Sequence, residues 1–566
     1  MTLLDTRPAP DAASAPTPWW DGAVVYQVYL RSFRDGDGDG IGDLRGLLSG
    51  LADIAELGCD AIWLNPCYAS PQADHGYDIA DYRRIDPAYG TLDDFDDVVA
   101  EAHRLGIRVL MDMVANHCSR EHPWFHAALA AGPGSAERGR FHFAPGTGDR
   151  GQLPPNNWRS VFGGSAWTRV TEADGQPGEW YLHSFDPAQP DLNWRNADVA
   201  DDFRGVMRFW FDRGVDGFRI DVAHGHVKAP GLPDWPGADD ESGGHNDAMW
   251  DQPEVHGIYR DWRAIGDAYT PPKYFVGEVW VPSPTRLADY LRPDELHQAF
   301  CFDLLVQPWD AGRLRAAIAT GLELSDRAPA WTLSNHDVHR TVTRYGQEQV
   351  LGPVDPSDMI SAARRTGPAD LELGARRAAA AAALLLALPG TVYLYQGEEL
   401  GLPEVFDLPP AARQDPIWIR SGGAQLGRDG CRVPLPWDRE RADFGFGSGT
   451  TPAWLPQPEW LGAYARAAQH GDPRSMLSLY RSLTRLRRDR FDADAPLVWM
   501  DVDAEGVLAF VRGRTLCVVN AGATAFRVPA DWAVGALVIA TASSRAGTVA
   551  CDSTAWYDLT SPERNR

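Results

Sequence analysis

The sequence of 566 residues is poor in cysteine and in basic charge. Its seven cysteines stand apart from one another with no C-x-x-C pair, which argues against both a disulfide framework and a zinc site. Lys and Arg together number 53 against 78 Asp and Glu, which gives a formal net charge of −25. Nucleic acid and anionic membranes both attract basic surfaces, so we expect neither as a partner.

Export and membrane signals are also missing. Residues 1–18 have neither the basic n-region nor the apolar h-region of a signal peptide, and their Pro, Ala, Asp and Ser content predicts a disordered tail. The longest run of small apolar residues, Ala378 to Leu388, is shorter than the ~20 residues of a membrane span and stops at Pro389. This run predicts a buried helix, and we expect a cytoplasmic protein with reduced thiols.

Several cofactor and catalytic motifs are absent as well. The glycine-spaced runs that begin at Gly38 and Gly445 do not complete G-x-G-x-x-G between a strand and a helix, so no dinucleotide site is predicted. The sequence has no Walker A lysine motif and no H-E-x-x-H, and Gly163 does not begin a G-x-S-x-G elbow. These absences argue against nucleotide-dependent, zinc-protease and serine-hydrolase chemistry.

Eight short β-branched or aromatic runs alternate with helical segments such as Leu44–Leu57 and Thr91–Leu105. This alternation predicts βαβ units, and eight of them predict an α/β fold, a (β/α)₈ TIM barrel with its chemistry at the C-terminal strand ends. Periodicity alone leaves a doubly wound sheet as the alternative. The expected strands are Val24–Phe33, Asp60–Leu64, Val109–Val114, Gly217–Val222, Tyr274–Val279, Ala299–Val306, Ala330–Ser334 and Thr391–Tyr395.

The third and fourth expected strands are too far apart for one helix and two short loops. The gap is rich in Gly, Pro, Trp and Asn, which indicates an inserted functional element over the barrel mouth. Near the C-terminus, short β runs separated by turn residues predict an antiparallel β module. The expected domains are a tail (1–18), the barrel (19–117 and 191–490), an inserted subdomain (118–190) and a C-terminal β-sandwich (491–566).

Polar side chains stand where four of these strands end. Arg219 and Asp221 are two residues apart and therefore share one face of the fourth strand. The carboxylates at these strand ends should meet at one mouth of the barrel, because a barrel core would not bury them unpaired. The residues concerned are Asp112 to His117, Arg219, Asp221, Glu278, His336 and Asp337.

Paired carboxylates beside an arginine suit glycoside hydrolysis. One carboxylate attacks the anomeric carbon, while the other, held protonated, donates a proton to the leaving oxygen. Arg219 would keep Asp221 ionised, whereas Val279 and Trp280 give Glu278 apolar surroundings that favour a raised pKa. Ordinary ion pairs at strand ends are the alternative for any one of these acids, but four polar strand ends together favour catalysis.

The segments DMVANH, GFRIDVAHG, GEVW and SNHD, in this order, resemble the four short motifs of the α-amylase superfamily, glycoside hydrolase family 13. QPDLNW (Gln189–Trp194) resembles a fifth motif of that family. HGYDI, SVFGGSAW, YQGEELG and GRDGCRVPLPW are similar to its oligo-1,6-glucosidase and α-glucosidase branch. The resemblance covers residues 19–480, and it implies a TIM barrel with an inserted subdomain after the third strand and a C-terminal antiparallel β domain.

The resemblance implies a role for each matched residue. Asp221 would be the nucleophile, Glu278 the acid/base, and Asp337 would grip sugar hydroxyls and stabilise the oxocarbenium-like state. Asp78 and Arg428 would bind the non-reducing end and close the pocket, which would make the enzyme exo-acting. The other substrate-binding residues would be Tyr77, His117, Phe162, Arg219 and His336.

An acidic loop follows the first expected strand. Four aspartates alternate with glycines, and hard oxygen ligands on sharp turns are what Ca²⁺ or Mg²⁺ requires. The loop is similar to the start of an EF-hand, but Gly46 stands at the twelfth position instead of a bidentate Glu. The α-glucosidase branch implies a single structural Ca²⁺ here, with Mg²⁺ and a solvated acidic turn as alternatives. The expected ligands are Asp35, Asp37, Asp39, Asp43 and the backbone carbonyl of Ile41.

The expected protein is an exo-acting, retaining α-glucosidase that acts on small α-glucosides as a monomer or homodimer. Val222 resembles the residue of α-1,6-specific relatives, but Ala223 to Gly225 depart from their pattern. We therefore expect maltose-type α-1,4 links to be preferred, with oligo-1,6-glucosidase activity as runner-up. A transglucosidase, sucrose hydrolase or trehalose synthase would use the same triad. A non-catalytic amylase-like subunit is the remote alternative, against which the intact triad argues.

Overall fold

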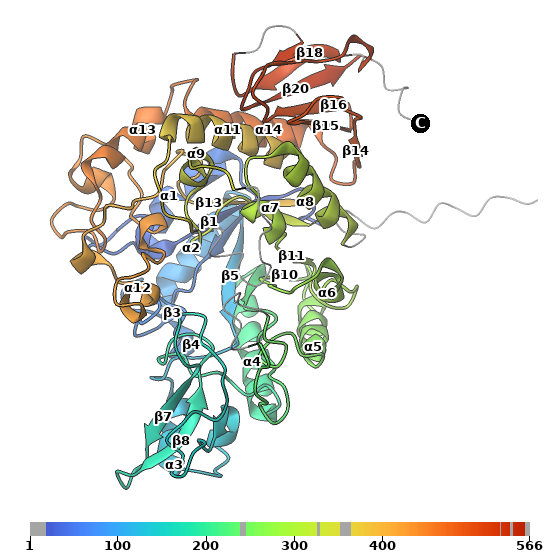
Figure 1. The fold of residues 1–566 in the computed structure, drawn as a ribbon. Helices are drawn as coiled ribbons and strands as arrows, with labels where there is room; N and C mark the ends of the chain where they lie inside the picture. The colour runs from blue at the N-terminus through green and yellow to red at the C-terminus, as the bar shows by residue number, and fades with distance from the viewer. Residues whose placement is uncertain are drawn as a thin grey trace, which may run out of the picture.

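The computed structural model describes residues 18–237, 245–324, 329–350, 364–532, 534–543 and 547–560, so nearly all of the expected tail lies outside the described residues. Its centre is a parallel sheet with the strand order β11-β10-β9-β5-β2-β1-β13-β12 (Figure 1). A bridge between Phe300 and Ala330 joins the two outer strands, so the sheet closes into the predicted barrel. The strands are β1 (Val24–Val28), β2 (Ala61–Leu64), β5 (Arg108–Val114), β9 (Gly217–Asp221), β10 (Tyr274–Gly277), β11 (Gln298–Ala299), β12 (Ala330–Thr332) and β13 (Thr391–Tyr395).

Local sequence signals fix where the outer helices begin and end. α1 (Leu44–Leu57) is the predicted helix, capped by Asp43 at its start and ended by Gly58 at a φ of 88°. α2 (Leu92–Arg104) begins with a capping box between Thr91 and Asp94. The other helices around the barrel are α4 (Ala197–Asp212), α5 (Val255–Asp267), α6 (Pro284–Asp289), α7 (Phe302–Val306), α8 (Ala311–Glu323), α9 (Thr341–Gly346), α11 (Leu371–Ala387), α13 (Arg466–Gln469) and α14 (Met476–Arg490).

The sixth strand is shorter than predicted. Only Gln298–Ala299 pair as β11, and most of the remaining apolar run forms the short helix α7. A short buried apolar run fits a strand and a helical turn equally well, so periodicity could not separate them. The first strand likewise ends at Val28, and Leu30–Ser32 form a 3₁₀ turn instead of its last residues.

The chain leaves the barrel between β5 and α4 and again after α14 (Figure 1). The first excursion holds α3 (Pro123–Ala131) and the antiparallel sheet β6-β8-β7, which lie within the range 118–190. The second forms the antiparallel sheet β14-β15-β16-β20-β18 and the pair β17-β19. The strands of these modules are β6 (Phe143–Ala144), β7 (Trp167–Thr171), β8 (Pro177–Leu182), β14 (Leu497–Trp499), β15 (Val507–Arg512), β16 (Thr515–Asn520), β17 (Phe526–Arg527), β18 (Val534–Ala540), β19 (Thr548–Val549) and β20 (Ser553–Leu559).

The alanine-rich run forms the buried part of α11, as predicted. Its small side chains let β20 approach closely, because Trp556 Nε1 donates to the carbonyl of Ala383 (3.1 Å) and Thr554 Oγ1 to that of Ala380 (2.8 Å). In the described parts of the chain, no helix is both long and apolar enough to cross a membrane. The seven cysteines are free thiols, and all except Cys551 are buried.

Candidate active site

One guanidinium gathers three carboxylates at the C-terminal ends of neighbouring barrel strands. Arg219 Nη1 donates to Asp112 Oδ1 (2.9 Å) and to Asp221 Oδ1 (2.6 Å), and its Nη2 donates to Glu278 Oε2 (2.5 Å). The exposed fractions of these four side chains do not exceed 11%. The strand ends therefore bring Asp221 and Glu278 together, as a retaining glycosidase requires of its two carboxyl groups.

Burial and crowding raise the pKa values of two acids in this cluster. Burial raises the pKa of Asp112 to about 6, against the opposing effect of Arg219. Burial also raises the pKa of Asp221, helped by the Glu278 and Asp112 carboxylates, while Arg219 lowers it. Arg219 thus acts in the predicted direction but does not outweigh burial. Three carboxyl groups that share one cation favour uptake of a proton by the group as a whole.

Both carboxylate oxygens of Glu278 are oriented by donors. Trp280 Nε1 donates to Oε1 (2.9 Å), and the backbone amide of Val222 joins Arg219 on Oε2 (3.1 Å). Val222 has a φ of 43°, a conformation that β-branched residues rarely adopt. The expected apolar neighbour Trp280 is therefore also a hydrogen-bond donor. Its ring is stacked on Phe302 with centroids 4.1 Å apart.

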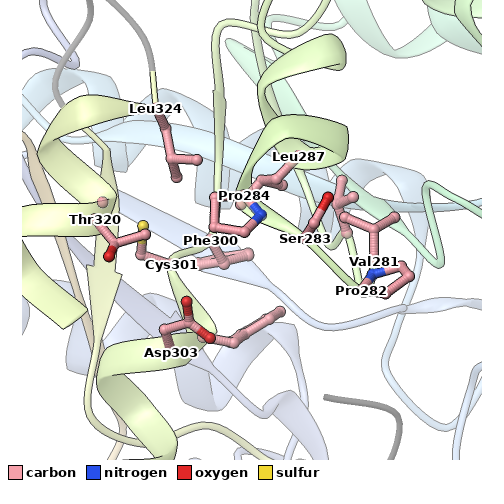
Figure 2. Close-up of a pocket in the computed structure, with 13 residues that line it drawn as sticks. Val281, Pro282, Ser283, Pro284, Leu287, Phe300, Cys301, Asp303, Thr320 and Leu324 are labelled. Carbon is pink, nitrogen blue, oxygen red and sulfur yellow. The ribbon is translucent and has the colours of Figure 1, made fainter. Parts of the chain in front are cut away.

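A cavity of about 180 Å³ lies beside this stacked pair, between the segment that follows β10 and the helices α6, α7 and α8 (Figure 2). Its lining is mostly apolar, and the Asp303 carboxylate at its edge belongs to an exposed residue. Converging polar groups mark the barrel mouth and not this cavity, so we assign it no ligand. Its apolar lining includes Val279, Val281, Leu287, Phe300, Phe302 and Leu324.

Asp337 lies in a second cluster, where cations balance the acids. Its Oδ1 accepts from Arg428 Nη1 (3.1 Å) and Arg432 Nη2 (3.0 Å), and its Oδ2 lies 3.3 Å from His336 Nε2. Burial alone would raise the pKa of Asp337, but His336 and the two guanidinium groups hold it far below its usual range. Burial lowers the pKa of His336, against the opposing effect of Asp337, whereas the two arginines carry fixed charges that keep Asp337 ionised.

Tyr77 connects the two clusters. Its ring is parallel to that of His336 at 5.4 Å, and its hydroxyl bonds both His336 Nε2 (2.8 Å) and Asp112 Oδ2 (3.0 Å). His117 lies beside it, with Nε2 3.1 Å from the carbonyl of Tyr77, and burial lowers the pKa of His117 to about 4. The structure thus brings Tyr77, His117 and His336 together with the acids, as predicted. Gln27, which bonds His336 Nδ1 (2.7 Å), had no sequence signal.

The Asp78 carboxylate is bonded within its own loop, and its part in binding the non-reducing end stays a prediction. Its two oxygens accept from Ser70 Oγ (3.0 Å) and from the amides of Asp74 and Ala73 (both 2.9 Å), so the side chain is consumed in shaping its own loop. Burial raises the pKa of Asp78 to about 6. The loop instead presents Asp74, whose Oδ1 accepts from Arg428 Nη2 (2.6 Å).

Arg428 organises the far side of the mouth. Besides Asp74 and Asp337, it donates from Nε to Asp415 Oδ2 (2.5 Å), and its guanidinium carbon lies 5.0 Å from the centre of the Phe162 ring. Arg428 and Phe162 therefore lie against each other at the mouth. Asp415 had no sequence signal, because its pairing with Arg428 is a tertiary contact.

A buried ion pair lies where the chain returns from the insert to the barrel. Lys228 Nζ lies 2.9 Å from Asp191 Oδ2, and both side chains are completely buried. The same ammonium donates to Asn116 Oδ1 (3.0 Å) and to the carbonyl of Gly225 (2.7 Å). Asp191, Asn116 and Gly225 each stand in one of the short motifs, whereas Lys228 lies three residues beyond Gly225 and had no sequence signal.

The acidic loop after β1 places three carboxylates together. Asp35, Asp37 and Asp39 each have an oxygen within 4.8 Å of the other two. Asp43 is not part of this group, and its carboxylate accepts from the amides of Gly36 (2.9 Å), Asp37 (3.0 Å) and Gly46 (2.6 Å). Three clustered oxygen donors on a tight loop fit a hard divalent cation.

The strand ends of this parallel barrel hold two paired carboxylates with an arginine between them, and an aspartate bound by two other arginines lies opposite. This arrangement defines a glycoside-hydrolase type of site. The α-amylase catalytic-domain model matches residues 27–493, and the chain belongs to this family.

Its relatives include a probable α-glucosidase of Rhizobium meliloti strain 1021, 38% identical over 83% of this chain and 82% of that protein. An oligo-1,6-glucosidase of Parageobacillus thermoglucosidasius is 34% identical over 83% of this chain and 84% of its own length. Among solved structures, the α-glucosyl transfer enzyme XgtA has a TM-score of 0.82 and 34% identity, covering 96% of this chain and 99% of its own. An isomaltulose synthase of Erwinia rhapontici NX5 has a TM-score of 0.83 and 29% identity, covering 97% and 100%.

Proposed function

We propose that this chain is an exo-acting, retaining α-glucosidase that releases α-glucose from the non-reducing end of short α-glucosides, with maltose-type α-1,4 links preferred over α-1,6 links. The observation that carries the proposal is the pairing of Asp221 and Glu278 on Arg219. The names of the relatives, α-glucosidase and oligo-1,6-glucosidase, support the same substrate class.

The geometry suits a double displacement. Asp221 attacks the anomeric carbon while the protonated Glu278 donates its proton to the leaving oxygen, which forms a glycosyl-enzyme and frees the aglycone. The ionised Glu278 then takes a proton from water, whose oxygen attacks the anomeric carbon and releases Asp221. Asp337, held ionised by Arg428 and Arg432, stabilises positive charge on the sugar in both transition states.

Replacement of the nucleophile tests the proposal. Asp221→Asn should lower kcat on a nitrophenyl α-glucoside by about a thousandfold or more, because no covalent intermediate forms. Asp216→Asn is the matched control, since Asp216 lies just before the opposite end of β9 and accepts from the amide of Val109 (2.9 Å). Equal rates for Asp221→Asn and wild type would overturn the assignment.

A sugar-transferring or isomerising reaction is the second candidate. It is favoured by the structural similarity to enzymes whose names describe glucosyl transfer and isomaltulose synthesis. The two candidates differ in whether water or a sugar receives the glucosyl group. Product analysis on maltose, isomaltose, sucrose and trehalose at low and high sugar separates them, because transfer products grow with sugar concentration whereas hydrolysis gives free glucose.

We also propose that the loop of Asp35, Asp37 and Asp39 binds a structural Ca²⁺, with Mg²⁺ as the alternative. The cluster of three carboxylate oxygens supports this site, and Asp43 and the carbonyl of Ile41 would complete it as the resemblance implies. The cation would neutralise the loop and take no part in catalysis. Millimolar Ca²⁺ should raise the melting temperature of EDTA-treated wild type but not that of Asp37→Asn, since a ligand stabilises only the state that binds it. Equal shifts in both proteins would refute the site.

Cytoplasmic location and a monomeric or homodimeric state complete the proposal. The seven free thiols support a reducing compartment, and the net charge of −25 supports the absence of a nucleic-acid partner. Light scattering on the purified protein would contradict the expected state if it gave a larger assembly.

A further inference from the structure

Arg420 connects two walls of the barrel mouth that belong to different parts of the chain. It is the last residue of α12 (Pro416–Arg420), which follows β13. Its Nε donates to the carbonyl of Phe162 (3.3 Å), and its Nη2 donates to the carbonyl of Gly163. Its Nη1 also lies 3.7 Å from Asp186 Oδ2. All three partners lie in the insert, so one side chain fastens the insert to α12.

The opposite end of α12 is tied to Arg428. Asp415 caps the helix by accepting from the amide of Ile417 (2.7 Å), and the same carboxylate binds the Arg428 side chain. The Arg428 guanidinium in turn lies over the Phe162 ring. Arg428, Asp415, α12, Arg420 and Phe162 therefore form a closed ring of contacts around one side of the mouth.

We propose that Arg420 is a positioning residue that holds Phe162 against Arg428 and thereby keeps the non-reducing end of the sugar pocket closed. This inference rests on the proposed exo-acting α-glucosidase function. Arg420 acts only through the insert loop, because its hydrogen bonds go to backbone carbonyls and not to the polar groups of the mouth. A planar guanidinium can serve two adjacent carbonyls at once, which a lysine ammonium cannot do with the same geometry.

The insert loop has its own support, so loss of Arg420 should loosen it without unfolding it. The amide of Val161 donates to the carbonyl of Ser184 (2.9 Å), and Ser160 Oγ donates to the carbonyl of Phe185 (2.7 Å). Beyond these bonds, Gly163 and Gly164 have φ values of 89° and 77°. Glycines in this region regain wide conformational freedom when their outer contacts are removed.

Hydrogen exchange tests the positioning role directly. In Arg420→Ala, amides of residues 160–164 should exchange about tenfold faster than in wild type, with Arg420→Lys in between. Ile419→Ala is the matched control, because Ile419 is the neighbouring residue of α12 and is 64% exposed. Unchanged exchange in Arg420→Ala, or an equal increase in Ile419→Ala, would overturn the proposal.

The pocket readout uses two nitrophenyl maltosides, one free and one carrying a 4,6-cap on its non-reducing sugar. Wild type should strongly prefer the free substrate, and Arg420→Ala should lower this preference in kcat/KM about tenfold, mainly through KM. A preference equal to that of wild type would refute the closing role. If wild type cleaves neither maltoside nor a simple nitrophenyl α-glucoside, the proposed function fails, whereas the exchange measurement still decides whether Arg420 positions the loop.

Discussion

Glu398 is a buried acid that should make the stability of this protein fall as the pH rises. It lies in the loop after β13, where Tyr480 Oη donates to its Oε1 (2.8 Å). Its Oε2 is buried and has no hydrogen-bond partner among the described residues. Burial raises the pKa of this carboxyl from 4.5 to about 7, and the neighbouring Glu399 adds to the effect.

The sign of the pH dependence follows from linkage. Because the carboxyl holds its proton more tightly in the folded state, its contribution is fully present below pH 4.5 and is lost as the pH rises through about 7. The difference between 4.5 and about 7 corresponds to about 3 kcal/mol of unfolding free energy, as an upper bound for one buried group. Glu398→Gln keeps an oxygen acceptor for Tyr480 and removes the titration.

Urea unfolding at pH 5 and pH 8 measures this effect. The variant should gain about 2–3 kcal/mol relative to wild type between the two pH values, because only wild type must ionise a buried carboxyl. Glu404, whose pKa burial also raises to about 7, is present in both proteins and cancels. Glu459→Gln, at an exposed position, should show no such gain. A difference between Glu398→Gln and wild type that is the same at both pH values would refute the reasoning.

Two further predictions concern the mouth and the buried pair of Lys228 and Asp191. Asp74→Asn should raise KM for maltose about tenfold with a smaller effect on kcat, whereas Asp78→Asn should mainly lower the melting temperature. The reason is that Asp74 faces Arg428, while Asp78 is bonded within its own loop. The opposite pattern would identify Asp78 as the binding residue. Lys228→Met should lower the unfolding free energy by about 3–5 kcal/mol, since it leaves Asp191 charged and buried. Adding Asp191→Asn to this variant should recover part of the loss. Additive losses in a double-mutant cycle would contradict a direct ion pair.

The barrel and the meeting of the acids at its strand ends could be predicted because their signals are local. Arg219 and Asp221 share a strand face by period-two alternation, and parallel strand ends meet at one edge. Helix α1 was predicted at both ends, since Leu44–Leu57 is periodic and Gly58 follows it. What failed depends on contacts between distant segments. Whether an apolar run such as Phe302–Val306 becomes strand or helix is decided by its neighbours, and local patterns do not report them.

The placement of Asp78 has the same origin. Two aspartates four residues apart are chemically equal in the sequence, and either one offers a carboxylate to Arg428. The loop decides between them, because the amides of Ala73 and Asp74 occupy Asp78 and leave Asp74 facing the mouth. The position of Arg420 could not be predicted for a related reason. Its hydrogen-bond partners are backbone carbonyls, which every residue possesses and no motif marks.

The two clusters at the mouth differ in charge balance, and this difference assigns their roles. Around Arg219, three carboxyl groups share one cation, which favours retention of a proton by the group as a whole. Around Arg428 and Arg432, the cations hold the pKa values of Asp337 and Asp415 low, so these acids stay ionised. Tyr77 touches both clusters through its hydroxyl without carrying charge itself. Acid catalysis through a positive transition state requires a group that holds a proton beside a group that stays negatively charged. We therefore expect that neutralising the acids of either cluster abolishes glycoside cleavage, in the first case for lack of a proton donor and in the second for lack of charge stabilisation.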